Sequence, residues 1–212
     1  MTTVTEPPTH TLRWHVNRNP AHITRHAEPD CNWVHTWRVE NFTEDQKLYG
    51  TAVHEAAHAV LLCAAGVPIH SITVRTMTDA AAASLPNGEN TRGPYKVALY
   101  DLLTGLCAGE RAEDRWLHQT NLWTPNRAWA IERHARNDRT MAYQAIQDTA
   151  DLPLTYGQSS DWTDLAVIHD HTDQAIDRYW SNITDLADAL ITHRHLNAKQ
   201  IVRIARIDNP AA

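Results

Sequence analysis

The most constraining feature of this 212-residue sequence is an apolar run that holds three ionisable side chains. From position 51 to position 65 every residue is Ala, Val, Leu or Cys, with four exceptions: Thr51, His54, Glu55 and His58. Such a run predicts a helix that is largely buried. Burying an imidazole or a carboxylate costs on the order of several kcal/mol unless the group is paired or coordinated. A divalent metal ion would supply that compensation.

The spacing of the two histidines agrees with a shared metal ion. His54 and His58 are four residues apart, so they lie on one face of a helix and both rings can reach the same ion. Zinc accepts imidazole ligands and keeps an open position in catalytic sites, where a bound water has its pKa lowered to about 7. In this H-E-x-x-H pattern Glu55 is placed to act as the base. The alternative is a pair of core histidines that are hydrogen-bonded to other groups.

Local signals define the ends of this helix. Thr43 and Gln46 have the spacing of a capping box, which predicts a start near residue 44. Gly66 suits a left-handed C-terminal cap and Pro68 cannot continue the helix, so the predicted end is Ala65. The next segment, 69–76, alternates apolar and polar residues and predicts a strand.

The rest of the chain predicts mainly helices. A loop at 85–94 is followed by a second helix, and Thr124 with Pro125 predicts the start of a third. The predicted helices after the strand are 95–117, one polar helix within 118–156, 161–180, 182–193, and a short helix after Asn197.

The N-terminal residues 1–42 differ from the rest of the chain. They contain prolines, histidines and tryptophans, and apolar residues alternate around Trp14 and Trp37, which indicates two short strands. We therefore divide the chain into an arm at 1–42 and a domain at 43–207 that carries an inserted helix at about 118–156.

Composition excludes several classes of partner. A net charge of −6 lacks the basic character that binds nucleic acid. No apolar run is long enough to anchor the chain in a membrane, and the first residues lack the pattern of a signal peptide. Three scattered cysteines are too few for a disulfide framework. We expect a cytoplasmic protein.

Three segments together resemble one family. Residues 54–60 read H-E-A-A-H-A-V and resemble the H-E-A-G-H-A motif of the FtsH-type ATP-dependent zinc metallopeptidases. Residues 108–114, A-G-E-R-A-E-D, are similar to that family's G-G-R-A-A-E-E helix, and residues 157–161, G-Q-S-S-D, to its G-A-S-N-D segment. The C-terminal helices are also similar, so the resemblance covers about residues 45–204.

The resemblance implies a ligand set. In the family the Asp of the G-A-S-N-D segment is the third metal ligand, and the matching residue here is Asp161. Asp161 could instead be the N-cap of the next helix, and Asp164 is the substitute ligand. Glu113 has three possible roles: an acceptor that orients a ligating histidine, a ligand itself, or a solvated carboxylate.

Departures from the family limit what it implies. Ala57 stands where the family has Gly, and the interval between Glu113 and Asp161 is much longer than the family's. The sequence contains no G-x-x-x-x-G-K-[ST] segment, so we expect no ATP-driven unfolding by this chain.

The expected fold is mainly α, a zincin-like metallopeptidase domain with a small β element, whose strand at 72–76 resembles the edge that receives substrate in the family. The expected function is hydrolysis of peptide bonds in unfolded or flexible polypeptide, with a zinc ion held by His54, His58 and Asp161. The competing hypothesis is a non-catalytic zinc-binding regulator or adaptor. A homo-oligomer or a separate ATPase partner is compatible with either.

Overall fold

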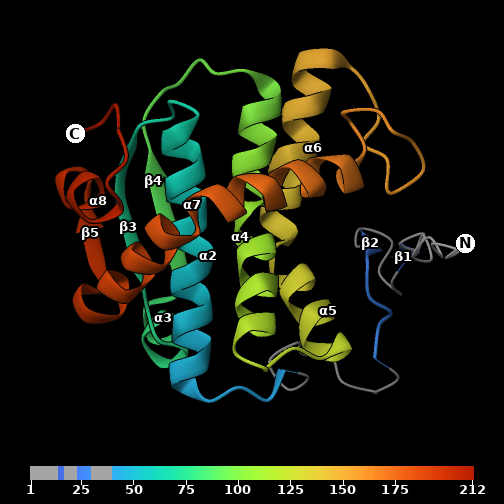
Figure 1. Cartoon of the computed structure of the whole chain (residues 1–212). Coiled ribbons are helices and arrows are strands. Elements are labelled where there is room, and N and C mark those ends of the chain that lie inside the picture. Colours follow the sequence, from blue (N-terminus) through green and yellow to red (C-terminus); the bar gives the residue numbers. More distant parts are fainter. Residues whose placement is uncertain (1–13, 17–22, 30–39) are drawn as a thin grey trace, which may run out of the picture.

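The computed structural model describes residues 14–16, 23–29 and 40–212, and it is mainly helical with a small sheet, as expected. Its centre consists of three long helices: α2 (Glu44–Ala64), α4 (Leu99–Gln119) and α7 (Leu165–His193). Helices α2 and α4 lie side by side and run in opposite directions, and α7 crosses both (Figure 1). Apolar residues of all three helices form one continuous core. Glu55 and His58 of α2 are therefore buried at the edge of this core, and His54 is partly buried.

Helix α2 begins and ends where its sequence predicts. The Thr43 side chain accepts a hydrogen bond from the Gln46 N–H, and the Gln46 side chain accepts one from the Thr43 N–H, which completes the capping box. At the other end Gly66 has a φ of +91°, a conformation that favours glycine. Both signals act through residues within one turn of the helix ends.

Glycine permits the close packing of α2 against α4. A Cβ atom on Gly105 would collide with the side chain of Leu62, so the two helices meet at a separation that no larger residue would allow. The two glycines one turn apart on α4, Gly105 and Gly109, predict such a close approach, and the structure confirms it.

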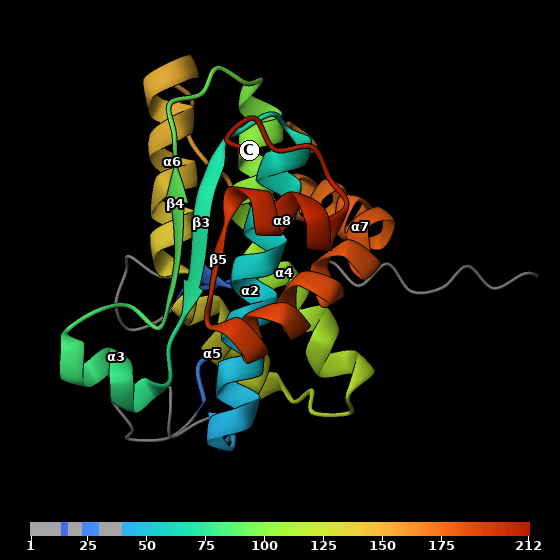
Figure 2. The ribbon, with the colours of Figure 1, turned by 90° about the vertical axis from the view of Figure 1, so that its left-hand side faces the viewer.

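The sheet lies against α2 on the side away from α4 (Figure 2). Its strands are antiparallel in the order β4 (Gly88–Arg92), β3 (Ile69–Val74) and β5 (His195–Asn197). The predicted strand at 69–76 is confirmed as β3. The expectation that 72–76 forms the open edge is wrong, because β3 has a partner on each side and β4 is an outer strand of the sheet.

Strand β4 occupies the segment 85–94, which the sequence predicts as a loop. Its sequence, G-E-N-T-R, has no apolar residue, so neither hydrophobic alternation nor strand propensity indicates a strand. Pairing with β3 creates the strand through tertiary contact alone.

The inserted segment forms two helices where one was predicted. Thr124 and Pro125 open the first of them as expected, and neither a glycine nor a proline marks the junction at Ala135. The two helices are α5 (Pro125–His134) and α6 (Arg136–Ala150), and both pack against α4. Figure 1 shows α6 beside α4.

Helix α7 is continuous where two helices were predicted. The predicted break falls near Asn182, a residue that often caps helices. In the structure the Asn182 side-chain amide instead donates a hydrogen bond to the carbonyl of Ala205, the last residue of α8 (Ala198–Ala205). The short helix α3 (Met77–Ala83), which was not predicted, links β3 to β4.

The described part of the N-terminal arm is attached to the inserted helices. Strands β1 (His15–Val16) and β2 (Ile23–Thr24) pair antiparallel, so the strand predicted near Trp14 is present. The strand predicted around Trp37 lies outside the described residues. Among the described segments, none of the helices has the length and apolarity that a bilayer span requires.

Candidate metal centre

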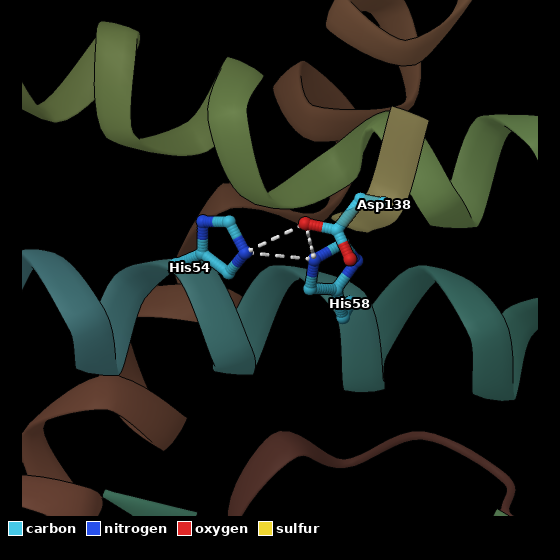
Figure 3. Close-up of side chains that lie close together, drawn as sticks. All are labelled: His54, His58 and Asp138. Carbon is cyan, nitrogen blue, oxygen red and sulfur yellow. Dashed lines mark hydrogen bonds and ion pairs between the residues drawn. The ribbon is translucent and has the colours of Figure 1, made fainter. Parts of the chain in front are cut away.

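Three potential ligand atoms meet between α2 and α6. The Nε2 atoms of His54 and His58 lie 3.0 Å apart, and the Asp138 Oδ2 atom lies 3.2 Å from the first and 3.4 Å from the second (Figure 3). His54 and His58 are successive on one face of α2, whereas Asp138 comes from the first turn of α6. This is the one group of its kind among the residues that the structure describes.

Hydrogen bonds on the far side of each ring fix the orientation of both imidazoles. The His58 Nδ1 atom lies 2.8 Å from the Gly105 carbonyl oxygen, which can only accept, so this nitrogen carries the proton. The His54 Nδ1 atom lies 2.9 Å from Glu113 Oε2. In neutral rings with these tautomers, both Nε2 atoms present lone pairs to each other and to a carboxylate oxygen. Three acceptors then converge without a donor, an arrangement that a cation stabilises.

The geometry fits the donor preferences of zinc. A tetrahedron with bonds of about 2.0–2.1 Å has edges of about 3.3 Å. The three observed separations, 3.0, 3.2 and 3.4 Å, are close to that value. Two imidazole nitrogens and one carboxylate oxygen are also a donor set found in catalytic zinc sites, with the fourth position left for water or substrate.

Gly109 makes the space for this arrangement. A Cβ atom at this position of α4 would lie 2.5 Å from the Nε2 atoms of both His54 and His58. Any other residue at this position would therefore displace the two imidazole rings from their observed positions. The sequence predicts a close approach at Gly109, and the structure shows that the partner is the imidazole pair.

The pKa shifts of His54 and Asp138 indicate that a positive charge is stabilised between the three side chains. Burial lowers the pKa of His54, but its hydrogen bonds to Asp138 and Glu113 outweigh burial and raise the pKa well above 6.5. Burial raises the pKa of Asp138, but the neighbouring His58 and His54 lower it far more strongly. In the metal-free protein an extra proton on His54 Nε2 would turn one of the three acceptors into a donor that faces the other two. A proton and a divalent metal ion therefore compete for one position.

Glu55 lies in the same cavity, between α2 and β4. Its carboxylate accepts a hydrogen bond from the Asn90 side-chain amide, which also donates to the Glu55 backbone carbonyl at 3.1 Å. Gly88 of β4 lies directly against it, since a Cβ atom there would overlap the Glu55 carboxylate. Burial raises the pKa of Glu55, which makes it a stronger base than an exposed glutamate.

Glu113 lies where an acceptor that orients His54 would lie, the first of the three roles considered from the sequence. Its carboxylate is bonded to His54 Nδ1, the ring nitrogen that faces away from Asp138. An acceptor at this position holds the ring and increases the basicity of the opposite nitrogen. Glu113 therefore lies behind the His54 ring and outside the group His54, His58 and Asp138 that could hold a metal ion.

The structure does not bring Asp161 to the histidines. Asp161 is exposed in the loop before α7, where its carboxylate accepts a hydrogen bond from the Ser159 hydroxyl. The carboxylate that lies beside the two histidines is that of Asp138, because the inserted helix α6 packs on α4 and directs it towards α2.

Asp164, the substitute ligand, is the N-cap of α7. It is fully buried, and its carboxylate accepts hydrogen bonds from backbone N–H groups of the preceding loop and of Ala166. A hydrogen bond from the Thr155 hydroxyl, together with these backbone bonds, lowers the pKa of Asp164 against the opposing effect of burial. The capping role considered for Asp161 therefore belongs to Asp164.

One sequence signal could have identified Asp138. The two buried residues of α6 are Ala142 and Ile146, four and eight positions after Asp138. Asp138 thus falls on the apolar face of its helix, where a carboxylate without a partner would be costly. It belongs to no recognised motif, so spacing alone gave no reason to select it.

A cavity of about 500 Å³ opens over the group. His54, Glu55, His58 and Asp138 all line it. One wall is the outer strand β4, and another contains apolar side chains, among them Phe42, Trp116 and Ile131. The three potential ligands and the candidate base are therefore accessible to a molecule much larger than water.

Comparison with known proteins gives no independent assignment: no protein-family model and no curated protein sequence matches this chain.

Proposed function

We propose that this protein is a zinc-dependent peptidase in which His54, His58 and Asp138 hold the metal ion and Glu55 is the catalytic base. One observation carries the proposal: three oriented acceptor atoms converge at tetrahedral spacing in a cavity that also contains a buried carboxylate. A structural zinc ion usually has four protein ligands, whereas this group provides three. The incomplete set favours catalysis over the alternative of a non-catalytic zinc-binding adaptor.

Each side chain has a distinct task in the proposed reaction. A bound zinc ion would supply Lewis-acid catalysis, polarising a carbonyl group and acidifying water. Glu55 accepts the proton of the attacking water and then delivers it to the leaving amine. Asn90 holds the Glu55 carboxylate in position through its amide, and burial keeps this carboxylate basic. Glu113 and the Gly105 carbonyl hold the two rings.

Strand β4 offers a binding surface for an extended polypeptide. In the described structure β4 pairs with β3 along one edge only, and the cavity lies beside it. An extended peptide that pairs with this edge would pass Gly88, which lies against Glu55. Backbone pairing tolerates many sequences. Such a site would therefore select extended, unfolded chains and would not require one particular side chain. A folded substrate would not bind, because its backbone groups are already paired.

Chelation tests this function. The purified chain should cleave unfolded casein, lose that activity with a chelator, and regain it when zinc is restored. ATP should have no effect on the purified chain. Cleavage that persists at the same rate after the metal has been removed and metal analysis has confirmed the removal would contradict the proposal.

A further inference from the structure

A buried ion pair joins α4 to α6 directly beside the metal centre. Arg139 follows Asp138 on α6, and Glu110 follows Gly109 on α4. The Arg139 Nε atom donates to Glu110 Oε2 at 2.8 Å, and the exposed fractions of the two side chains are 13% and 2%. Each member of the pair is thus the chain neighbour of a residue that touches the histidines.

The ion pair lies close to polar groups of several other elements. The other Glu110 oxygen lies 2.5 Å from His169 Nε2 of α7. Arg139 also donates to the carbonyl of Ile23 in β2, and its Nη2 atom lies 3.5 Å from Glu132 of α5. Residues of α4, α5, α7 and β2 therefore lie around the ion pair of Arg139 and Glu110.

The first turn of α6 contacts other elements through Asp138, which meets the two histidines, and through Arg139. The buried residues of α6 are Ala142 and Ile146, and both lie after the first turn. Within residues 136–140 the side chains are exposed or half-buried. Successive side chains on a helix diverge by about 100°, so Arg139 can point to α4 while Asp138 points to α2. Contacts made by Arg139 thus limit how far the helix can rotate about its axis.

We propose that Glu110 and Arg139 are positioning residues that set the location of Asp138 as the third metal ligand; this inference rests on the proposed zinc site. A buried ion pair has directional bonds that an apolar contact lacks, and replacing such a pair by apolar groups is often neutral for stability. Stability and ligand placement can therefore be separated in this protein. Loss of Arg139 misplaces Asp138 by rotation of the first turn of α6, and zinc is then held mainly by the two histidines.

A double-mutant cycle on zinc affinity tests this inference. Zinc dissociation constants would be measured by chelator competition for wild type, Arg139→Met, Asp138→Asn and the combined variant. We expect Arg139→Met to weaken zinc binding by about 10- to 100-fold, the usual effect of losing an outer-sphere partner. In the Asp138→Asn background the same change should have almost no further effect, since the ligand that it positions is already absent.

Two controls keep the test decisive. Circular dichroism establishes folding, and if Arg139→Met alone fails to fold, Glu110→Gln combined with Arg139→Met removes the unpaired charge and replaces it in the cycle. Arg206→Met, which breaks the exposed pair with Asp185, should leave zinc affinity unchanged.

The outcomes separate the inference from the proposed function. Equal losses from Arg139→Met in both backgrounds, or wild-type affinity in Arg139→Met, would overturn the positioning role while leaving the zinc site intact. A wild-type protein that binds no zinc would overturn both. Peptidase activity is not needed for any of these measurements.

Discussion

The Nε2 atoms of His54 and His58 lie 3.0 Å apart, although the Nδ1 atom of each ring already has its own acceptor. Neutral rings in these tautomers cannot hydrogen-bond to each other through Nε2, because neither of those atoms carries a proton. The carboxylate of Asp138 adds a third acceptor at the same point. The proposed metal binding and the proposed catalysis both require that a divalent ion can occupy this point.

Asp138 and Asp161 give opposite predictions for metal binding. Asp138→Asn should weaken zinc binding by more than the roughly 10- to 100-fold expected for an outer hydrogen-bond partner, because it removes a ligand. Asp161→Asn is the matched control and should bind zinc as wild type does, since Asp161 is exposed and bonded to Ser159. Metal analysis and chelator competition on both variants decide between them. A larger loss in Asp161→Asn would restore the ligand set implied by the family resemblance.

Gly109→Ala should impair zinc binding. The new methyl group would lie 2.5 Å from both Nε2 atoms, so the rings must move apart. Helix propensity alone would favour Ala over Gly by about 1 kcal/mol, so any weaker zinc binding cannot be attributed to a weaker helix. Circular dichroism of Gly109→Ala should show a folded protein, which assigns any loss of affinity to the displaced rings. Unchanged zinc affinity in Gly109→Ala would show that the rings are not held as described.

Zinc binding should strengthen as the pH rises. The pKa of His54 is raised above 6.5 in the metal-free protein, because its hydrogen bonds to Asp138 and Glu113 outweigh burial. The stability gained from protonating His54 is therefore complete below about pH 6.5 and is lost as the pH rises through the raised pKa. Zinc needs the neutral ring, so the zinc-induced increase in Tm should be small near pH 6 and larger near pH 8. Thermal unfolding with and without zinc across this range measures it, and a constant increase would argue against histidine ligation.

The N-terminal arm should contribute to the stability of the fold. The backbone N–H and Nε of Arg25 both donate to Glu132, whose side chain is 1% exposed. Arg25→Met leaves this buried carboxylate with weaker partners and should lower the free energy of unfolding by about 3 kcal/mol. Arg206→Met breaks an exposed pair with Asp185 and should cost less than about 1 kcal/mol. Urea denaturation of both variants tests the contrast; equal losses would mean that the arm is not a structural part of the domain.

Features encoded by neighbouring residues could be predicted from the sequence. The boundaries of α2 follow from Thr43, Gln46 and Gly66, which act within one turn of the helix ends. The pairing of His54 with His58 follows from helix geometry alone. Both predictions needed no knowledge of how distant segments pack.

Features created by packing could not be predicted. Strand β4 has no apolar residue and exists because it pairs with β3. Asp138 reaches the histidines because α6 packs on α4. These two helices are separated in the sequence by α5, so their contact is not a local feature. The family resemblance placed the third ligand at Asp161 because it contains no equivalent of α6.

The most direct test of the central claim is Glu55→Gln, with zinc content and casein cleavage measured on the same preparation. The substitution leaves His54, His58 and Asp138 unchanged but removes the base, so the variant should retain zinc and lose cleavage by about 10²- to 10⁴-fold. Glu44→Gln, at an exposed position in the first turn of the same helix, should retain both. A Glu55→Gln protein that holds zinc and cleaves casein at the wild-type rate would contradict the claim that this site is a peptidase.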